Sequence, residues 1–527
     1  MKYDPKVYGL VRSNLVCGEA MSPSTDAESK NNELRQSEED QTSDEPGEPD
    51  DGRFSRRTSL YNSETLQRLL VDCITYKSTI EDIEVVIKCG AKINESVKRG
   101  LKPLHHAAYG DYVPCVQFLI EKGADVNATD DIGYTPIHLC ARKGNVASMK
   151  VLIQHGAIVD FFNSEKGIDE NAKALGYLTI EPLNLALENN HVDCVRLLLE
   201  NGAKPDHLYF MGYEINLVPL EHLECLEILL MYGADPNVFN RCGTSPLMKA
   251  CRQQNIDACR MLLKYGAQVN LQCPSLFEQK TALHFAIDKG NIGIIHMLLR
   301  QGASPSRPDS YKFAALHAAV LKDRPDVCEM LLRWRADVEE KTDENATALM
   351  LACATPSLKL QRDLIELLLQ HGADPNAHSN ILSYSSPCLS PLTEYLKNIA
   401  EKVTYEIAHA LIKHGARVNF KGSTSIARLK DPHGVLHYLP NDKVKDRADI
   451  FDLLAEAGSS FDVHAIKYDS GLNTRERSIL TQLASKPLSA RQLVRLYIRE
   501  LMIPRVPDRV NRLPLPSVVR SGIRTHD

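Results

Sequence analysis

The sequence has no long apolar run and no excess of positive charge. None of its apolar segments reaches the roughly 18 residues of a membrane-spanning helix, and residues 1–22 lack the apolar core of a signal peptide. The chain holds 62 Lys and Arg against 68 Asp and Glu, which gives a formal net charge of −6. Because it has no broad basic field, we expect it to bind neither nucleic acid nor membrane. We expect it in the cytoplasm, with the nucleus as a second compartment.

The sequence also lacks the short motifs of the common enzyme classes. It contains no phosphate-binding loop, no dinucleotide-binding glycine pattern, no HExxH zinc motif and no nucleophile elbow. We expect the paired carboxylates Glu339 and Glu340 on an exposed loop, in contact with water. The sequence therefore predicts a protein that is not an enzyme and has no catalytic residue, metal or cofactor.

The 14 cysteines include no CxxC pair, which argues against structural zinc. Five of them precede a recurring Gly, or its counterpart Arg335, by seven or eight residues: Cys115, Cys194, Cys225, Cys259 and Cys328. Such recurrence is typical of one small, buried position on a helix, where a free Cys behaves as a small apolar residue. We expect free thiols, because a reducing compartment disfavours disulfides.

Residues 1–57 have the composition of a disordered acidic tail. Between Glu19 and Asp51 there are twelve acidic residues and two basic ones, with very few large apolar side chains. Just after it, Ser59 follows two arginines in RRTSL, a pattern that suits a basophilic kinase, and phosphorylation there would add nearly two negative charges. A chance pair of arginines in a linker is the alternative.

From residue 81 onward, a Gly-Ala pair closes one apolar helical run after another. The most frequent spacing between these glycines is 33 residues, and longer spacings indicate insertions near 161–180 and 377–390. Arg335-Ala336 and Gly458-Ser459 are degenerate copies. The regular glycines are Gly90, Gly123, Gly156, Gly202, Gly233, Gly266, Gly302, Gly372 and Gly415.

The segment 130–157 shows the local chemistry of one copy. Thr135 can cap a first helix through its hydroxyl, and Pro136 suits the first helical position, where a backbone N–H is not needed. Gly144 can end that helix in a left-handed turn. A second helix then runs through Val151 to Ile153 and ends at Gly156. Each copy is thus expected to be a pair of helices.

These features resemble the ankyrin-repeat superfamily, whose period is about 33 residues. The resemblance implies an all-α solenoid of about ten to eleven repeats over 58–465, which binds another protein through its loops and first helices. His105, His138, His284 and His317 occupy the same repeat position, one per repeat, and therefore cannot converge on a metal. We expect each ring to be hydrogen-bonded inside its repeat.

The composition changes again after the repeats, with a linker expected at 466–484 and a small domain at 485–527. Pro487 and Ser489 favour a helix start, and Pro504 ends the helix. Its apolar stripe requires a partner groove. The apolar residues on or near that stripe are Leu493, Leu496, Tyr497, Ile498 and Leu501. From periodicity alone, a helix that caps the solenoid is an equal alternative.

Helix 488–502, the proline-broken linker and LPLP at 513–516 resemble a SOCS box. Repeats followed by such a box are the layout of the ankyrin repeat and SOCS box family. That resemblance implies a substrate-recognition adaptor of a cullin-RING ubiquitin ligase, whose target protein the sequence does not name. It also implies elongin B/C as a partner, bound through the positions Ser489, Ala490, Leu493, Val494, Leu496, Tyr497, Ile498 and Leu501. It further implies cullin-5, with its RING protein, selected through Leu513, Pro514, Leu515 and Pro516.

This box departs from the family pattern in three places. Ala490 stands where the family has Leu, Val494 where it has Cys, and Gly522 near the expected Tyr, so the box is degenerate or truncated at its end. The Ala490 change removes about three buried carbons, on the order of 2 kcal/mol. The alternative function is a non-catalytic ankyrin scaffold without coupling to ubiquitin.

Overall fold

The computed structural model divides the chain into two units, Met1–Leu60 and Tyr61–Asp527. All described residues belong to the second unit. They are 63–161, 181–209, 212–274, 279–308, 311–378, 389–397, 403–421, 433–438, 447–469 and 471–485.

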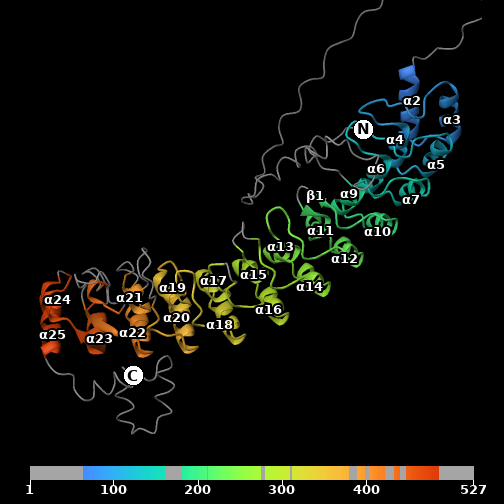
Figure 1. Ribbon diagram of the computed structural model, residues 1–527. Helices are drawn as coiled ribbons and strands as arrows, with labels where there is room; N and C mark the ends of the chain where they lie inside the picture. The colour runs from blue at the N-terminus through green and yellow to red at the C-terminus, as the bar shows by residue number, and fades with distance from the viewer. Residues whose placement is uncertain are drawn as a thin grey trace, which may run out of the picture. The chain divides into compact units, whose positions relative to one another are not determined.

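The second unit is built from helix pairs that follow one another in chain order (Figure 1). The first helices of the pairs form one row and the second helices form another. Within each row, most helices pack against the next one. The first-helix row consists of α2 (Ser63–Thr75), α4 (Pro103–Tyr109), α6 (Pro136–Lys143), α9 (Pro182–Glu188), α11 (Glu214–Leu217), α13 (Pro246–Gln253), α15 (Ala282–Lys289), α17 (Ala315–Leu321), α19 (Ala348–Ala354) and α21 (Pro391–Leu396). The second-helix row consists of α3 (Ile80–Lys88), α5 (Val113–Glu121), α7 (Val146–Gln154), α10 (Val192–Glu200), α12 (Leu223–Met231), α14 (Ile256–Lys264), α16 (Ile292–Arg300), α18 (Pro325–Arg333), α20 (Gln361–Gln370) and α22 (Tyr405–Lys413).

Short elements complete the described part. The strands β1 (Leu208–Tyr209) and β2 (Gly212–Tyr213) pair antiparallel, and β3 (Val418–Phe420) pairs parallel with β4 (Gly458–Phe461). A 3₁₀ turn, η2, spans Leu436–Tyr438, and the chain continues through α23 (Arg447–Ala457), α24 (Val463–Tyr468) and α25 (Thr474–Ser485). The fold is therefore almost entirely helical, as the repeats predict.

The repeated glycines end the helices as expected. Gly144 caps α6 with φ of 79°, and Gly156 follows α7 with φ of 85°, both in the left-handed region that favours glycine. Arg335 keeps this conformation at φ 63°, which confirms it as a degenerate copy. Gly458 differs, because it begins β4 instead of ending a helix in a left-handed turn.

On the second helices from α5 onward, and on α23, a fully buried leucine lies four residues before the recurring Gly or its counterpart Arg335. Before Gly90, on α3, that position is the buried Val86. Each contributes to one continuous hydrophobic core that runs through the described repeats. Burying a leucine side chain stabilises the fold by roughly 1.5–3 kcal/mol. These residues are Leu119, Leu152, Leu198, Leu229, Leu262, Leu298, Leu331, Leu368, Leu411 and Leu454.

The five recurring cysteines occupy the expected buried helical position, and all are free thiols. Burial raises the pKa of Cys115 and of Cys328 to about 12, so the thiol form predominates at neutral pH. Cys251 lies 3.9 Å from Cys259 between their sulfur atoms, without a disulfide bond. These side chains therefore serve as small core residues.

The repeat histidines join neighbouring repeats. In His284, Nδ1 accepts the Thr281 N–H at 3.4 Å, while Nε2 lies 3.1 Å from the Phe313 carbonyl oxygen of the next repeat. His105 makes the same contacts with Lys102 and Tyr134, and His317 makes them with Ala314 and Glu340. Only the neutral ring with its proton on Nε2 satisfies both partners.

The helix caps differ in one detail from the sequence expectation. The Thr135 hydroxyl lies 2.8 Å from Nδ1 of His138, and the same ring nitrogen accepts the Thr135 N–H at 3.1 Å. The start of α6 is thus fixed through the histidine ring. Thr347 shows the simpler expected cap, because its hydroxyl accepts the Met350 N–H.

The segment 466–484 was expected to be a linker, but it contains the end of α24 and almost all of α25. The apolar side chains of Ile466 and Leu480 are buried there and belong to the core of the repeats. Helix α25 packs against α23 and α24. The sequence signal was weak because this pair has no Gly-Ala pair and no 33-residue spacing.

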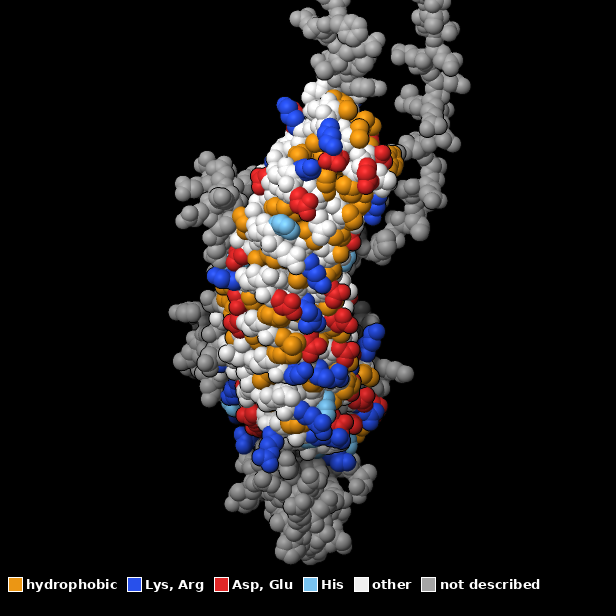
Figure 2. Space-filling model, turned by 90° about the vertical axis from the view of Figure 1, so that its right-hand side faces the viewer, with side chains coloured by type: hydrophobic (Ala, Val, Ile, Leu, Met, Phe, Trp, Pro, Cys, Tyr) orange, Lys and Arg blue, Asp and Glu red, His pale blue; other side chains and the backbone are white. Residues whose placement is uncertain are grey.

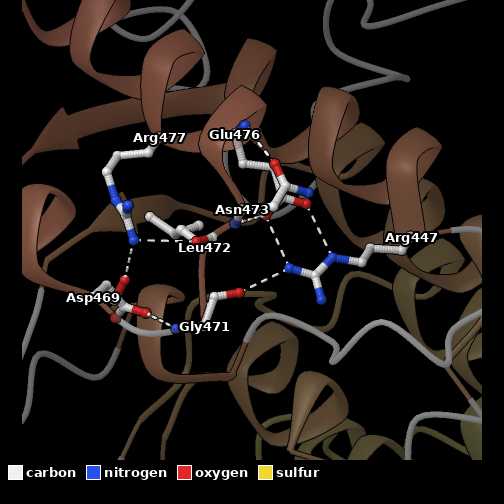
Figure 3. A network of polar contacts seen from close by, with 7 residues as sticks. All are labelled: Arg447, Asp469, Gly471, Leu472, Asn473, Glu476 and Arg477. Carbon is white, nitrogen blue, oxygen red and sulfur yellow. Dashed lines mark hydrogen bonds and ion pairs between the residues drawn. The ribbon is translucent and has the colours of Figure 1, made fainter.

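An ion pair fixes α25 to α23 (Figure 3). Arg447 donates two hydrogen bonds to the Glu476 carboxylate, both at 2.9 Å, and a third to the Gly471 carbonyl at 2.8 Å. Glu476 also accepts the Asn473 N–H, while the Asn473 side chain accepts the Glu476 N–H. The side chains of Arg447 and Glu476 are only 12% and 6% exposed. Burial alone would raise the pKa of Glu476, but these hydrogen bonds outweigh it and lower the pKa.

The histidine contacts predict acid sensitivity. Burial lowers the pKa of His284 and of His317 to about 4. Between pH 6.5 and 4 the unfolded chain takes up protons that the folded repeats exclude, so stability falls as the pH is lowered through this range. Replacing both by Asn, the residue at this position in α9 and α11, removes these two titrations.

We expect the His284→Asn/His317→Asn protein to lose about 1–3 kcal/mol at pH 7.5. Its loss of stability between pH 7.5 and 5 should be smaller than that of the unmodified protein. Urea unfolding followed by circular dichroism at both pH values measures this. His464→Asn, at an exposed ring, is the control and should leave the pH dependence unchanged. An unaltered pH dependence in the double variant would contradict the assignment.

The Arg447–Glu476 ion pair predicts a local loss of structure on substitution. Arg447→Ala leaves a buried carboxylate without its partner, which costs about 3–5 kcal/mol. Hydrogen–deuterium exchange over 471–485 should therefore rise strongly. Arg475→Ala is the matched control, because Arg475 is 71% exposed and lies 3.7 Å from Asp452. That change should cost less than about 1 kcal/mol. Equal exchange in the two variants would refute the role of the ion pair.

Candidate protein-binding surface

The two helix rows present different surfaces to a partner. The first helices bury one face against the second helices and expose the residues of their last turn. Arg252, Lys289, Leu321 and Lys322 are exposed at the ends of α13, α15 and α17. Because these helices are consecutive in their row, the four side chains occupy equivalent ends of adjacent helices.

Several charges of the second-helix row are paired within that row. Arg260 contacts Asp257 on α14, Arg333 contacts Glu329 on α18, and Lys264 reaches Glu227 of α12. Figure 2 views the side on which α3, α5, α7 and α10 lie in Figure 1, and there basic and acidic side chains lie intermingled. Such exposed pairs stabilise the fold very little, but they leave a surface without a dominant sign of charge.

The first-helix row over α13, α15 and α17 has an excess of positive charge. Asp288 is its one carboxylate among the residues that the structure describes, and it lies between two lysines. Its oxygens are 3.5 Å from Lys280 Nζ and 3.4 Å from Lys322 Nζ. Within the described ranges, Arg252 and Lys289 contact no carboxylate at all. Charge on these two side chains is therefore available to a partner.

Lys249, on α13, is a half-buried cation in the same row. Its Nζ donates to the carbonyl oxygens of Asn216 at 2.9 Å and Val218 at 3.0 Å. Burial lowers the pKa of Lys249, while the charge of Glu221 raises it. Lys249 thus ties α13 to the preceding repeat, and we assign it a structural role.

Glu339 and Glu340 are not the solvated pair that the sequence suggested. Glu339 accepts the Asp374 N–H at 2.7 Å, and Glu340 accepts the Arg307 N–H, so each carboxylate joins a neighbouring loop. Burial raises the pKa of both groups. They hold adjacent repeats together, which explains why they lie half-buried in a loop.

The site residues predicted from the sequence all lie outside the described residues. This holds for the elongin-directed positions between Ser489 and Leu501, for the cullin-directed motif Leu513 to Pro516, and for Ser59. The insertions near 161–180 and 377–390 also fall largely outside them. Over the described part of the chain, His, Cys, Asp and Glu form no cluster suited to a metal. No helix there has the length and apolarity to cross a membrane.

Sequence reasoning did not single out the cations of the first-helix row. Arg252, Lys289 and Lys322 are ordinary exposed residues in the sequence, and many Lys and Arg residues have that character. The available signal was their shared place at the ends of consecutive first helices, which the repeat alignment could have shown.

Relatives of known name match parts of the repeat region. Human palmitoyltransferase ZDHHC17 is 32% identical over 191 residues, which are 27% of this chain and 29% of that protein. The Drosophila melanogaster transient receptor potential cation channel subfamily A member 1 is 24% identical over 234 residues, 41% of this chain and 19% of the channel. The chain thus spans less than a third of either relative, and the alignments assign no activity to it.

One solved structure is also similar, the crystal structure of the human ASB11 ankyrin repeat domain. It is 25% identical, with a TM-score of 0.38, and the match covers 45% of this chain and 99% of that domain.

The family comparison is more extensive. A model described as ankyrin repeats in three copies matches residues 70–164, 133–208, 217–309 and 308–379, together more than half of the 527 residues. These ranges contain most of the helix pairs and left-handed glycines, and all of the bridging histidines, described above. The chain therefore belongs to the ankyrin repeat family.

Proposed function

We propose that this chain is the substrate-recognition adaptor of an elongin B/C–cullin-5–RING ubiquitin ligase. The ankyrin repeats bind the target protein, and the segment 485–527 acts as a SOCS box that recruits the ligase. The RING partner brings the ubiquitin-transfer chemistry, so the adaptor needs no enzymatic activity of its own. It raises the effective concentration of target lysines near the ligase.

The observation that carries this proposal is the order of motifs in the sequence. Repeats are followed by a segment whose sequence predicts an amphipathic helix, and then by the LPLP motif at 513–516. A helix of this length is unstable alone in water and requires a groove for its apolar stripe. Because α25 ends at Ser485, the proposed box follows the last described helix directly.

Three further assignments belong to this proposal. Residues 1–57 form an acidic tail, and phosphorylation of Ser59 would tune recruitment of a partner. We place the protein in the cytoplasm, with the nucleus as a second compartment.

The competing function is an ankyrin scaffold that organises partners without ubiquitin, and the C-terminal segment discriminates between the two.

Elongin binding is tested by removing two apolar anchors. Leu493→Ala with Ile498→Ala should abolish co-purification of elongin B/C, because interface anchors of this kind contribute about 2 kcal/mol or more each. The melting temperature of the repeats should stay unchanged. If the chain is a scaffold, we expect the double variant to have a lower melting temperature, and elongin to co-purify with neither the variant nor the unmodified chain.

The departure at position 490 gives a gain-of-function test. If the segment binds elongin C as a weakened box, Ala490→Leu should tighten the interaction about tenfold, which corresponds to about 1.4 kcal/mol. Titration of purified elongin B/C against both proteins measures the change. Absence of binding by either protein would remove the ligase proposal.

The cullin-directed motif is tested separately. Leu513→Ala with Leu515→Ala should weaken cullin-5 association severalfold and leave elongin binding unchanged, because the motif lies beyond the elongin-directed helix. Pull-down of the variant with both partners present distinguishes the two losses. Equal loss of elongin and cullin-5 would contradict the separate roles.

A further inference from the structure

We propose that the exposed ends of α13, α15 and α17 bind an extended acidic segment of the target protein. Arg252, Lys289 and Lys322 would receive its carboxylates, and Leu321 would contact an apolar side chain between them. The inference rests on the proposed function only in that it describes how the repeats capture a target. It does not involve the C-terminal segment.

The three cations lie on one continuous surface. Helix α15 packs between α13 and α17 in the first-helix row. Arg252 is in the last turn of α13, Lys289 is the last residue of α15, and Lys322 caps α17. The ends of α15 and α17 are adjacent, because Lys322 Nζ lies 3.4 Å from the Asp288 carboxylate.

The charge on this surface is not balanced within the described chain. Across α13, α15 and α17, with the cap Lys322, four cations accompany one carboxylate, Asp288. One of the four is the structural Lys249, and the exposed three are Arg252, Lys289 and Lys322. In the same three repeats, the second helices α14, α16 and α18 carry four cations and three carboxylates. The imbalance is thus a property of one row and not of these repeats as a whole.

A helix end explains part of this arrangement, because cations near a helix C-terminus are favoured by about 0.3–1 kcal/mol. The second helices also carry cations in their last turns, at Lys264, Arg300 and Arg333. Two of those three are paired with a carboxylate, whereas Arg252 and Lys289 are not. The helix dipole therefore accounts for the positions of the cations and not for their lack of partners.

The spacing of the row suits an extended segment. Packed helices lie about 8–10 Å apart, and an extended chain advances about 3.3 Å per residue. Acidic residues about three positions apart can therefore meet successive cations. Leu321 is 37% exposed beside Lys322, which offers an apolar contact within the same surface.

The probe for this proposal is a fluorescein-labelled peptide of repeated Glu-Ser-Leu units, with a Lys-Ser-Leu peptide as its charge-reversed counterpart. Fluorescence anisotropy with the full chain should show binding of the acidic peptide alone. The affinity should fall as NaCl is raised, because exposed charges are screened.

The decisive variant reverses three charges, Arg252→Glu, Lys289→Glu and Lys322→Glu. We expect its affinity for the acidic peptide to fall at least about tenfold, a change of 1.4 kcal/mol. The matched control reverses Arg260→Glu, Arg300→Glu and Arg333→Glu on the second helices of the same repeats. This control changes the net charge by the same amount as the first variant. Because its three residues lie on the other helix row, it should retain the affinity within about threefold.

The proposal fails if both triple variants lose affinity equally, or if the Lys-Ser-Leu peptide binds as well as the acidic one. A single-stranded RNA oligomer that binds more tightly than the acidic peptide, through the same three cations, would also overturn it. If the first triple variant does not fold, Arg252→Gln with Lys289→Gln and Lys322→Gln replaces it. The same loss is then expected from neutralisation, and an unchanged affinity refutes the proposal.

Failure here is distinguishable from failure of the ligase proposal. The first-helix charge reversals should leave elongin B/C co-purification unchanged, since the elongin-directed positions lie at 489–501. If the first-helix charge-reversal variant loses peptide binding and retains elongin B/C, both proposals are supported. If the unmodified chain binds elongin B/C but not the acidic peptide, only the acidic-segment inference is overturned.

Discussion

No helix pair in this protein can bury its apolar face by itself, and the rest of the structure follows from that constraint. The recurring buried leucines and the free cysteines on the same helices contribute to one core that runs through the described repeats. Polar contacts follow the same path, because each bridging histidine connects its own helix start to a carbonyl of the next repeat. The stability of one repeat therefore depends on its neighbours.

An array built this way needs an end that does not expose its core. Helices α24 and α25 supply that end, with Leu480 and Ile466 buried and with Arg447 paired to Glu476. A partly buried ion pair of this kind is costly to break, because the remaining charge stays out of water. The segment that we propose as the ligase-binding box follows α25 in the sequence.

The repeat fold was predictable because its local signals recur. Gly-Ala pairs, the proline at the first helical position of several first helices, and a histidine in four of the repeats all occur at fixed offsets, and the structure confirms helix pairs at those places. The pair α24–α25 was missed because it carries none of these signals. Glu339 and Glu340 were misjudged because their partners, backbone N–H groups of neighbouring loops, belong to residues more than 30 positions away. The difference in charge between the two helix rows was missed because it appears only when the repeats are aligned and each charged residue is assigned to its helix.

We propose that one part of the chain binds a target and that another part recruits a ligase. Quantitative affinity purification of the full chain and of a chain that ends at Ser485 tests it most directly, since the shortened chain keeps α25. The account predicts that elongin B/C and cullin-5 disappear from the shortened protein while proteins bound by the repeats are retained. Loss of both sets together, or elongin B/C and cullin-5 at equal levels with the two proteins, would contradict it.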